Sequence, residues 1–103
     1  MILIFVSQVH REIKKAPSEF LYHSYSLLEE LLSGKTLGMP ISRPLYSLSK
    51  GLHELRLSGR SGEFRVFYLI KRGNIYVLHA CLKKTEKIDI KTRNLILARI
   101  QRL

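Results

Sequence analysis

The segment HACLKKTEKID, residues 79–89, contains the residue types that most directly suggest chemistry. An apolar run ends there in Lys83, Lys84 and Thr85, immediately before a predicted helix start. Adjacent cations repel each other, so folding alone gives little reason for the lysine pair. Lysine is a mobile point charge and arginine binds phosphate through two parallel hydrogen bonds, so a mixture of the two suits a phosphodiester.

Two arginines lie in apolar, β-like segments upstream of the lysines. Arg56 belongs to LHELRL and Arg65 to FRVFYLI. Because side chains alternate along a strand, both arginines are predicted to project from the uncovered face of neighbouring strands. Lys83 and Lys84 come at the end of the third such segment. We therefore expect three or four cations in one patch of a sheet.

An internal ion pair is the alternative explanation for these arginines. Arginine within an apolar strand is costly to bury without a partner, and Glu54 and Glu63 are the nearest acidic residues. Two glutamates are too few to neutralise Arg56, Arg65 and both lysines. The sequence thus favours an uncompensated patch that is open to an external anion.

The elements that would position this patch follow from hydrophobic periodicity. Strands are predicted at residues 1–6, 52–57, 64–70 and 75–82; helices at residues 9–15, 18–33 and 90–103, the last with Asp89 as N-cap; and a loop at residues 34–50. The predicted fold is α+β in the order β-α-α-β-β-β-α. Its twisted antiparallel sheet would have the helices packed on one face.

Length and composition restrict the class of protein. The 103 residues predict one domain, residues 1–103, with a single core. One cysteine, Cys81, excludes an internal disulfide and agrees with a reducing compartment. The opening MILIFV is predicted to be a strand rather than a signal peptide or membrane span. We therefore expect a soluble, cytoplasmic protein.

The charge is distributed unevenly along the chain. Lys and Arg number 18 and Asp and Glu 8, which gives a formal net charge of +10. Residues 1–49 hold five basic and four acidic residues and residues 50–103 hold thirteen and four, so the two halves carry +1 and +9. This asymmetry favours a polyanion or an acidic protein as partner. A basic surface that serves only solubility is the alternative.

Other chemistries receive less support from the sequence. The four histidines have no metal-ligand spacing with one another or with Cys81, and no glycine-rich nucleotide-binding motif is present. Cys81 itself is better explained as a small buried residue than as a nucleophile. We therefore expect neither a metal nor a small-molecule cofactor.

Residues 51–89 resemble the signature of the RelE/ParE toxin superfamily in its HigB-like, phage-derived branch. The matching residues are Gly51, Leu52, Glu54, Leu55 and Arg56; Arg65, Val66 and Tyr68; and Lys83, Lys84 and Thr85. The resemblance covers nearly the whole chain. Each motif alone is weakly specific, but all of them occur here in the order and at the spacing of the family. It implies a microbial RNase-like (RelE-like) fold and a type II toxin–antitoxin toxin that cuts mRNA on the ribosome without metal. The implied partners are a cognate antitoxin and ribosome-bound mRNA.

The resemblance also implies roles for individual residues in a cleavage by the RNA 2′-hydroxyl. Arg65 would stabilise the phosphorane charge, Arg56 would orient the phosphate, and Lys83 and Lys84 would neutralise it and the flanking backbone. Thr85, with two further residues, would add RNA contacts. Those two residues are Arg60 and Lys87.

The proton-transfer residues depart from the pattern of the family. Some relatives carry a tyrosine or histidine near the start of the last helix, where this chain has Ile88, Asp89 and Ile90. His53 replaces an aromatic residue and could act as acid or base. Alternation puts it beside Leu55, however, which favours a histidine of the core or rim. Tyr68 is equally open to a catalytic or a buried role.

Two other functions remain open from the sequence. One is a ParE-like inhibitor that binds DNA gyrase and cuts nothing, since a shared fold does not fix function. The other is a catalytically decayed module that binds RNA or an antitoxin. Retention of the arginines and lysines favours the nuclease over the gyrase inhibitor, whereas the altered helix start favours the decayed module.

Overall fold

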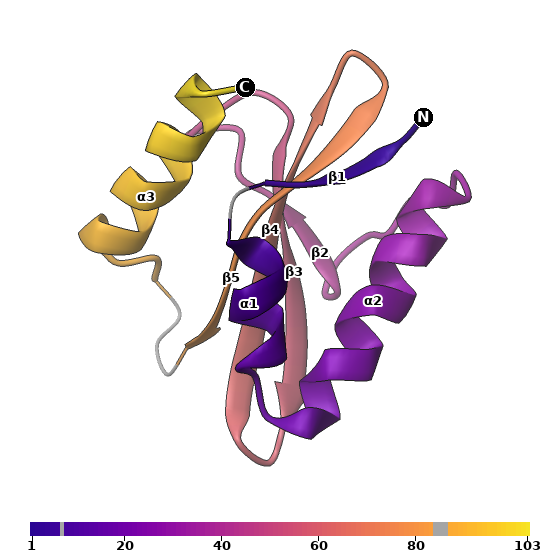
Figure 1. The fold of residues 1–103 in the computed structure, drawn as a ribbon, viewed down its shortest axis with the longest axis vertical. Helices are drawn as coiled ribbons and strands as arrows, with labels where there is room; N and C mark the ends of the chain where they lie inside the picture. Colours follow the sequence, from indigo (N-terminus) through magenta and orange to yellow (C-terminus); the bar gives the residue numbers. More distant parts are fainter. Residues whose placement is uncertain (7, 84–86) are drawn as a thin grey trace.

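A single five-stranded sheet organises the chain (Figure 1). The computed structural model describes residues 1–6, 8–83 and 87–103. In chain order the elements are β1 (Leu3–Phe5), α1 (Val9–Lys14), α2 (Ser18–Leu32), β2 (Ser42–Pro44), β3 (Leu52–Gly59), β4 (Gly62–Lys71), β5 (Asn74–Lys83) and α3 (Ile90–Gln101). The predicted α+β class and the predicted order of elements are confirmed, with β2 as an addition.

The strands lie in the order β1-β5-β4-β3-β2. The three long strands β3, β4 and β5 are joined by hairpins and pair antiparallel, as predicted. At one edge, however, β1 pairs parallel with β5, so the prediction of a wholly antiparallel sheet is wrong there. At the other edge, β2 pairs antiparallel with β3. Strand β2 lies within residues 34–50, which we predicted as a loop. Pro44 ends β2, which is compatible with an edge strand because one side of that strand needs no ladder hydrogen bonds.

Helix α2 follows the predicted apolar pattern. Its buried residues follow the helical i, i+3, i+4 pattern and pack against the sheet: Phe20, Ser24, Leu27, Leu28 and Leu31. Its boundaries agree with the sequence signals. Pro17 precedes the first turn, and the glycine after the C-cap, at position 34, has a φ of 96°.

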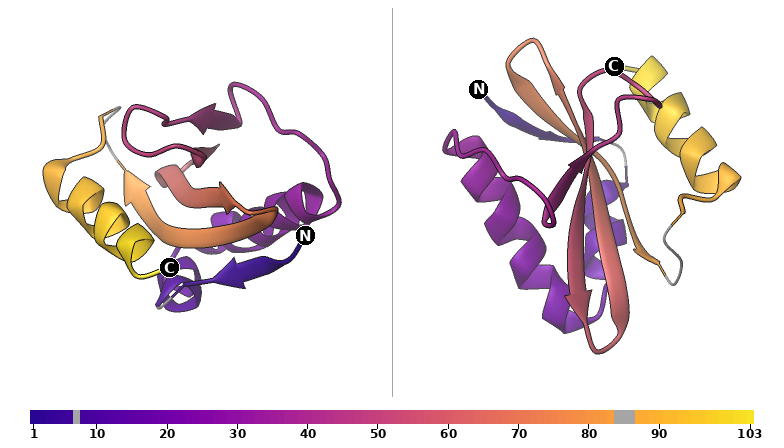
Figure 2. Two further views of the ribbon diagram at one scale, coloured as in Figure 1. Left: turned by 90° about the horizontal axis from the view of Figure 1, so that it is seen from above. Right: turned by 180° about the vertical axis from the view of Figure 1, so that it is seen from behind.

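The helices cover both faces of the sheet rather than one. Figures 1 and 2 show α2 and α3 on opposite sides of the strands. The core beneath α1 and α2 includes Phe64, Val66 and Tyr68, whereas the core on the α3 side includes Phe67 and Leu69. The prediction that all helices share one face is therefore wrong for α3. The nearly continuous apolar run of β4 is the sequence signal for a strand that is covered on both faces.

A buried polar cluster holds α3 against β5 and α1. The two terminal nitrogens of Arg99 in α3 each donate to one carboxylate oxygen of Glu12 in α1, both at 3.0 Å. Arg99 also donates to the Leu78 carbonyl at 2.7 Å. His79 Nδ1 lies 3.0 Å from Glu12 Oε1. Burial alone raises the pKa of Glu12, but the hydrogen bonds from His79 and Arg99 outweigh burial and bring the pKa to about 2. Glu12 is therefore ionised in the folded state at neutral pH.

None of the helices in the described ranges is both long enough and apolar enough to cross a lipid bilayer.

Candidate functional site

The two arginines singled out by the sequence lie opposite each other on the sheet. Arg56 of β3 and Arg65 of β4 are direct cross-strand partners. Both lie on the face away from α1 and α2, with Phe67, because Leu55 and Val66 occupy the other face. The predicted convergence of Arg56 and Arg65 is confirmed.

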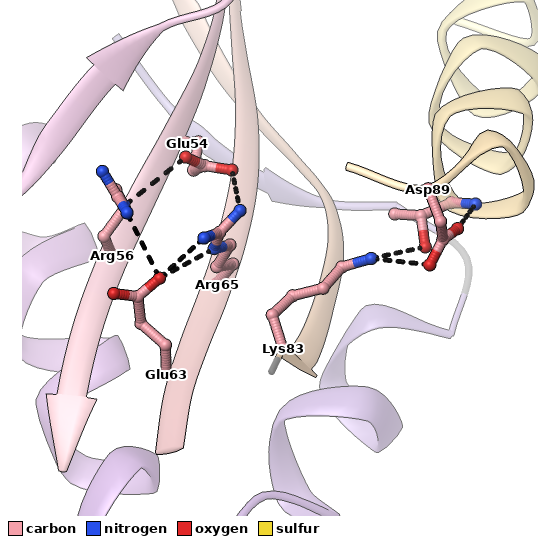
Figure 3. Close-up of polar contacts among 7 residues, drawn as sticks. Glu54, Arg56, Glu63, Arg65, Lys83 and Asp89 are labelled. Atoms are coloured by element: carbon pink, nitrogen blue, oxygen red, sulfur yellow. Dashed lines mark hydrogen bonds and ion pairs between the residues drawn. The ribbon is translucent and has the colours of Figure 1, made fainter. Parts of the chain in front are cut away.

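The arginines are not uncompensated, and that prediction is wrong (Figure 3). Glu63 Oε1 lies 2.7 Å from an Arg65 terminal nitrogen, 3.1 Å from Arg65 Nε and 3.4 Å from an Arg56 terminal nitrogen. Glu54 Oε2 lies 3.4 Å from another Arg65 nitrogen, and Glu54 Oε1 lies 3.8 Å from Arg56 Nε. Two carboxylates therefore face two guanidinium groups.

Burial explains why this compensation is needed. The side chains of Arg65 and Glu54 are each only 1% exposed, and a charge withdrawn from water requires a partner close by. Arg56 lies nearer the surface, and Glu63 is the most exposed of the four at 28%. The cluster thus has a buried base, made by Glu54 and Arg65, and a rim made by Arg56 and Glu63.

The two carboxylates of this cluster differ in their electrostatics. Burial raises the pKa of Glu54, although the nearby positive charges of Arg65, Arg56 and Arg43 oppose that rise. The hydrogen bond from Arg65 lowers the pKa of Glu63. Glu63 is therefore a carboxylate at neutral pH, held at the rim by two arginines.

Lys83 does not join the arginines but points to the start of α3 (Figure 3). Its buried Nζ lies 2.9 Å from Asp89 Oδ2 and 3.1 Å from Thr92 Oγ1. Asp89 also accepts the Thr92 backbone N–H at 2.7 Å, which confirms the predicted N-cap. The hydrogen bond from Lys83 lowers the pKa of Asp89. In this structure Lys83 therefore ties the end of β5 to α3.

The other predicted site residues have separate locations. Lys84 and Thr85 lie outside the described residues. Arg60 is exposed in the hairpin between β3 and β4, and Lys87 is exposed before α3. Of the two described residues, Lys87 lies near the arginine cluster, because it lines the cleft described below together with Glu54.

His53 lies on the other face of the sheet from Arg56 and Arg65. Its ring stacks on Tyr68 with centroids 4.9 Å apart, its Nδ1 lies 3.0 Å from the Gly51 carbonyl, and its Nε2 lies 3.3 Å from the Tyr46 hydroxyl. The structure thus separates His53 from the candidate site, in agreement with the rim alternative. Tyr68 is buried and its hydroxyl lies 2.8 Å from Ser42 Oγ, so it too is a core residue.

A cationic cleft that the sequence did not reveal adjoins the arginine cluster. It has a volume of about 500 Å³ and lies between the segment after β2 and the start of α3. Its lining comprises Arg43, Leu45, Ser47, Leu48, Glu54, Lys87, Ile88 and Arg93. Arg43, Lys87 and Arg93 are exposed, and Glu54 is the acidic side chain of the lining. We call this cavity, with its eight lining residues, the cationic cleft.

Tertiary pairing creates this cleft, which explains why sequence reasoning missed Arg43 and Arg93. Arg43 lies in the segment predicted as a loop, and only the pairing of β2 with β3 sets it opposite Glu54. Arg93 lies in the first turn of α3, so its position depends on the face against which α3 packs. The one available signal was Lys87, three residues from the same helix start.

The described residues favour neither a metal site nor thiol chemistry. Among them, no group of three His, Cys, Asp or Glu side chains is arranged to hold a metal ion. Burial raises the pKa of the Cys81 thiol to about 11. Cys81 is therefore a neutral thiol at pH 7, as expected if it is no nucleophile, although it is half-buried rather than buried as predicted.

Comparison with known proteins identifies the family. The family model described as "Phage derived protein Gp49-like" matches residues 11–101. The chain belongs to this family. The prediction of a phage-derived family is thereby confirmed. Comparison with curated proteins gave no match.

Solved structures show the fold of this Gp49-like chain. A double-arginine mutant of the E. coli toxin RelE in the free state is 19% identical, with 99% of this chain and 96% of that chain covered and a TM-score of 0.51. The isolated E. coli RelE toxin is 20% identical over 96% and 97% of the two chains, with a TM-score of 0.49. The E. coli RelBE toxin–antitoxin complex is 20% identical over 82% and 98%, with a TM-score of 0.47. The predicted RelE-like, microbial RNase-like fold is confirmed by the first of these likenesses.

The motif Gly51–Arg56 has a structural basis in this Gp49-like chain. Gly51 has a φ of 82°, and a Cβ there would lie 2.5 Å from the Ile70 carbonyl oxygen, so only glycine fits. Leu52 and Leu55 fill the two cores on opposite faces of the sheet. Together with the Glu54–Arg65 pair, these contacts account for much of the motif through folding alone.

Proposed function

We propose that this Gp49-like chain is the toxin of a type II toxin–antitoxin system and cleaves messenger RNA on the ribosome. The observation that carries the proposal is the cationic cleft, whose exposed Arg43, Lys87 and Arg93 adjoin the arginine cluster. Family membership and the RelE-like fold support it. So does the formal net charge of +10, because a cationic cleft attracts a phosphate backbone.

The arginine cluster supports phosphate binding through the place that Glu63 occupies. A single carboxylate oxygen, Glu63 Oε1, is shared by Arg56 and Arg65. An oxygen of a phosphodiester would have the same charge and the same need for two guanidinium donors. In the proposal, RNA held in the cationic cleft displaces the Glu63 side chain, which is partly exposed, and the scissile phosphate takes its place.

The proposed reaction requires charge stabilisation and proton transfer. The 2′-hydroxyl oxygen attacks the adjacent phosphorus, the bond from phosphorus to the 5′-oxygen breaks, and the products are a 2′,3′-cyclic phosphate and a free 5′-hydroxyl. The proton lost from the 2′-hydroxyl is balanced by one gained at the 5′-oxygen. Arg65 and Arg56 would stabilise the phosphorane charge, and Lys83 and Lys84 would act on the flanking backbone, as the family resemblance implies. An acidic antitoxin and a cytoplasmic location belong to the same proposal.

A second candidate is a catalytically decayed module that binds RNA or an antitoxin. The specific observation in its favour is that Arg56, Arg65 and Lys83 all have carboxylate partners within the fold. In this case the cationic cleft still binds RNA, but the arginines serve only stability.

Induction of the chain in cells followed by mapping of RNA 5′ ends distinguishes these functions. We expect cuts within translated messages from the wild-type chain. Arg65→Ala should abolish them, and Arg65→Lys, which retains the charge without the planar fork, should reduce them by about 10²-fold. Lys14→Ala, on an exposed position of α1, is the matched control and should cut normally.

Each variant is checked for folding by circular dichroism and thermal unfolding, because Arg65 is a buried partner of Glu54. Intact messages with a supercoiling defect contradict the nuclease and favour gyrase inhibition. Intact messages with no growth phenotype from a folded wild-type chain favour the decayed module.

A further inference from the structure

A large cavity lies at the other end of the sheet from the arginines. It has a volume of about 810 Å³, and a second cavity of about 170 Å³ adjoins it through shared lining residues, His53 and Ile70. This end carries the β4–β5 turn and the C-terminal ends of α2 and α3, at the top of Figure 1. We call the two cavities together the end groove.

The base and wall of the end groove are apolar. Leu69 and Ile100 line the larger cavity, and Leu31 and Ile75 line the smaller one. Ile70, which lines both, is 41% exposed, and Tyr46 at the wall is 60% exposed. Large apolar side chains that gather in one exposed hollow indicate a binding surface rather than a solvated one.

The rim of the end groove is cationic. Lys50, Lys71 and Arg72 line the larger cavity, and neither cavity has an acidic side chain among its described lining residues. Lys35, in the smaller cavity, has its Nζ 3.4 Å from Glu30. The groove thus joins an apolar base to a positive edge, and its complement is a negative ligand with apolar side chains.

Arg72 occupies a position that folding alone would assign to another residue type. Arg72 and Gly73 are the two turn residues between β4 and β5, with φ angles of 53° and 79°. A two-residue turn with positive φ at both positions favours Asn or Gly at the first of them. An arginine there is unfavourable for the backbone, which agrees with a role for its side chain at the rim.

We infer that the end groove binds an acidic peptide segment of a partner protein, with apolar side chains of that segment inserted over Ile70 and Leu69. The aliphatic base favours a peptide over single-stranded nucleic acid, whose bases stack on successive aromatic faces. Among the described lining residues, Tyr46 is the exposed aromatic ring, and the His53 ring is stacked on Tyr68. Ile70 lies five residues from Arg65 along β4, about 17 Å. The inference does not depend on RNA cleavage, because none of the described lining residues of the end groove belongs to the arginine cluster.

Selection of peptides from a library of random octapeptides displayed on phage tests this inference on the full-length chain. We expect the enriched peptides to combine Asp or Glu with Leu, Ile, Phe or Tyr. Ile70→Ser removes the exposed apolar contact, and Lys71→Glu with Arg72→Glu reverses the rim charge; each should weaken the best peptide by about tenfold or more. Arg11→Glu with Lys14→Glu, on exposed positions of α1, is the matched charge control and should bind as the wild type does.

Amide chemical shifts of the labelled chain then locate the bound peptide. Shifts at Gly51, Ile70 and Arg72, with none at Arg56 or Arg65, agree with the inference. Enriched peptides without acidic residues, equal binding by the Lys71→Glu/Arg72→Glu variant, or shifts confined to the cationic cleft overturn it. An octauridylate that binds the end groove more tightly than the best peptide also overturns it and assigns the groove to nucleic acid.

Discussion

The arginine cluster and the cationic cleft contain the same kinds of charge but differ in what surrounds them. In the arginine cluster, Arg65 is buried and shares two carboxylates with Arg56. In the cationic cleft, which Glu54 also lines, the three cations are exposed to solvent. Burial therefore determines the role of a cation in this molecule. A buried one requires a partner within the fold, whereas an exposed one can attract a ligand.

Glu54→Gln should produce the largest effect, because it removes the buried charge partner of Arg65. We expect the free energy of unfolding to fall by about 3 to 5 kcal/mol, as measured by urea denaturation at pH 7. Glu29→Gln, an exposed position on α2, is the matched control and should change it by less than about 0.5 kcal/mol. A loss below about 1 kcal/mol for Glu54→Gln would mean that the cluster is not a structural ion pair.

Acidic pH tests the same principle at the Glu12–Arg99 pair. The pKa of Glu12 is about 2 in the folded chain, against an ordinary value of 4.5. The unfolded chain therefore takes up a proton first, so stability is fully present above pH 4.5 and is lost as the pH falls towards 2. Glu12→Gln should cost about 2 kcal/mol at pH 7 and show a shallower decline between pH 4.5 and 2 in urea unfolding. Parallel pH curves for the two chains would contradict the assignment.

Arg43→Ala and Arg93→Ala test whether the cationic cleft binds RNA. Each change should weaken binding of a single-stranded oligonucleotide by about three- to tenfold in fluorescence anisotropy. Each should also reduce the slope of log affinity against log salt by about 0.7, since one phosphate contact is lost. Arg11→Ala is the control for an exposed cation elsewhere. An equal loss of oligonucleotide affinity in all three variants would mean that net charge, and not the cleft, determines binding.

Glu63→Gln should produce the smallest effect, and its sign separates two roles for Glu63. If Glu63 occupies the phosphate position, its neutralisation leaves the arginines available and RNA binding tightens by about threefold. If Glu63 serves only stability, RNA binding stays unchanged while the free energy of unfolding falls. Anisotropy and urea denaturation on the same variant distinguish the two outcomes.

Local patterns in the sequence were sufficient for much of the fold. The spacing of apolar residues predicted α2 and its end near Gly34, and Asp89 was predicted and confirmed as the N-cap of α3. Alternation along β3 and β4 predicted that Arg56 and Arg65 share a face. These features depend on residues within a few positions of one another, so the chain specifies them before any tertiary contact forms.

The candidate site was predictable only in part. The arginines were found, but their neutralisation depends on which residues meet across strands: Arg65 reaches Glu54, eleven positions away, through the β3–β4 pairing. Because residues 34–50 were predicted as a loop, strand β2 and the position of Arg43 in it were not predicted. His53 was a candidate by type, yet the strand pairing set its ring against Tyr68 on the other face.

The sequence by itself determined the order of the elements, the excess of positive charge in the second half and the membership of the Gp49-like family. Only the tertiary structure decided which cations are buried and which are exposed, and on which face α3 lies. The physical reason is distance along the chain: Glu12 and Arg99 are 87 positions apart, and Arg43 meets Glu54 through an edge strand of three residues. Such pairings depend on packing of the whole chain, which no local pattern encodes.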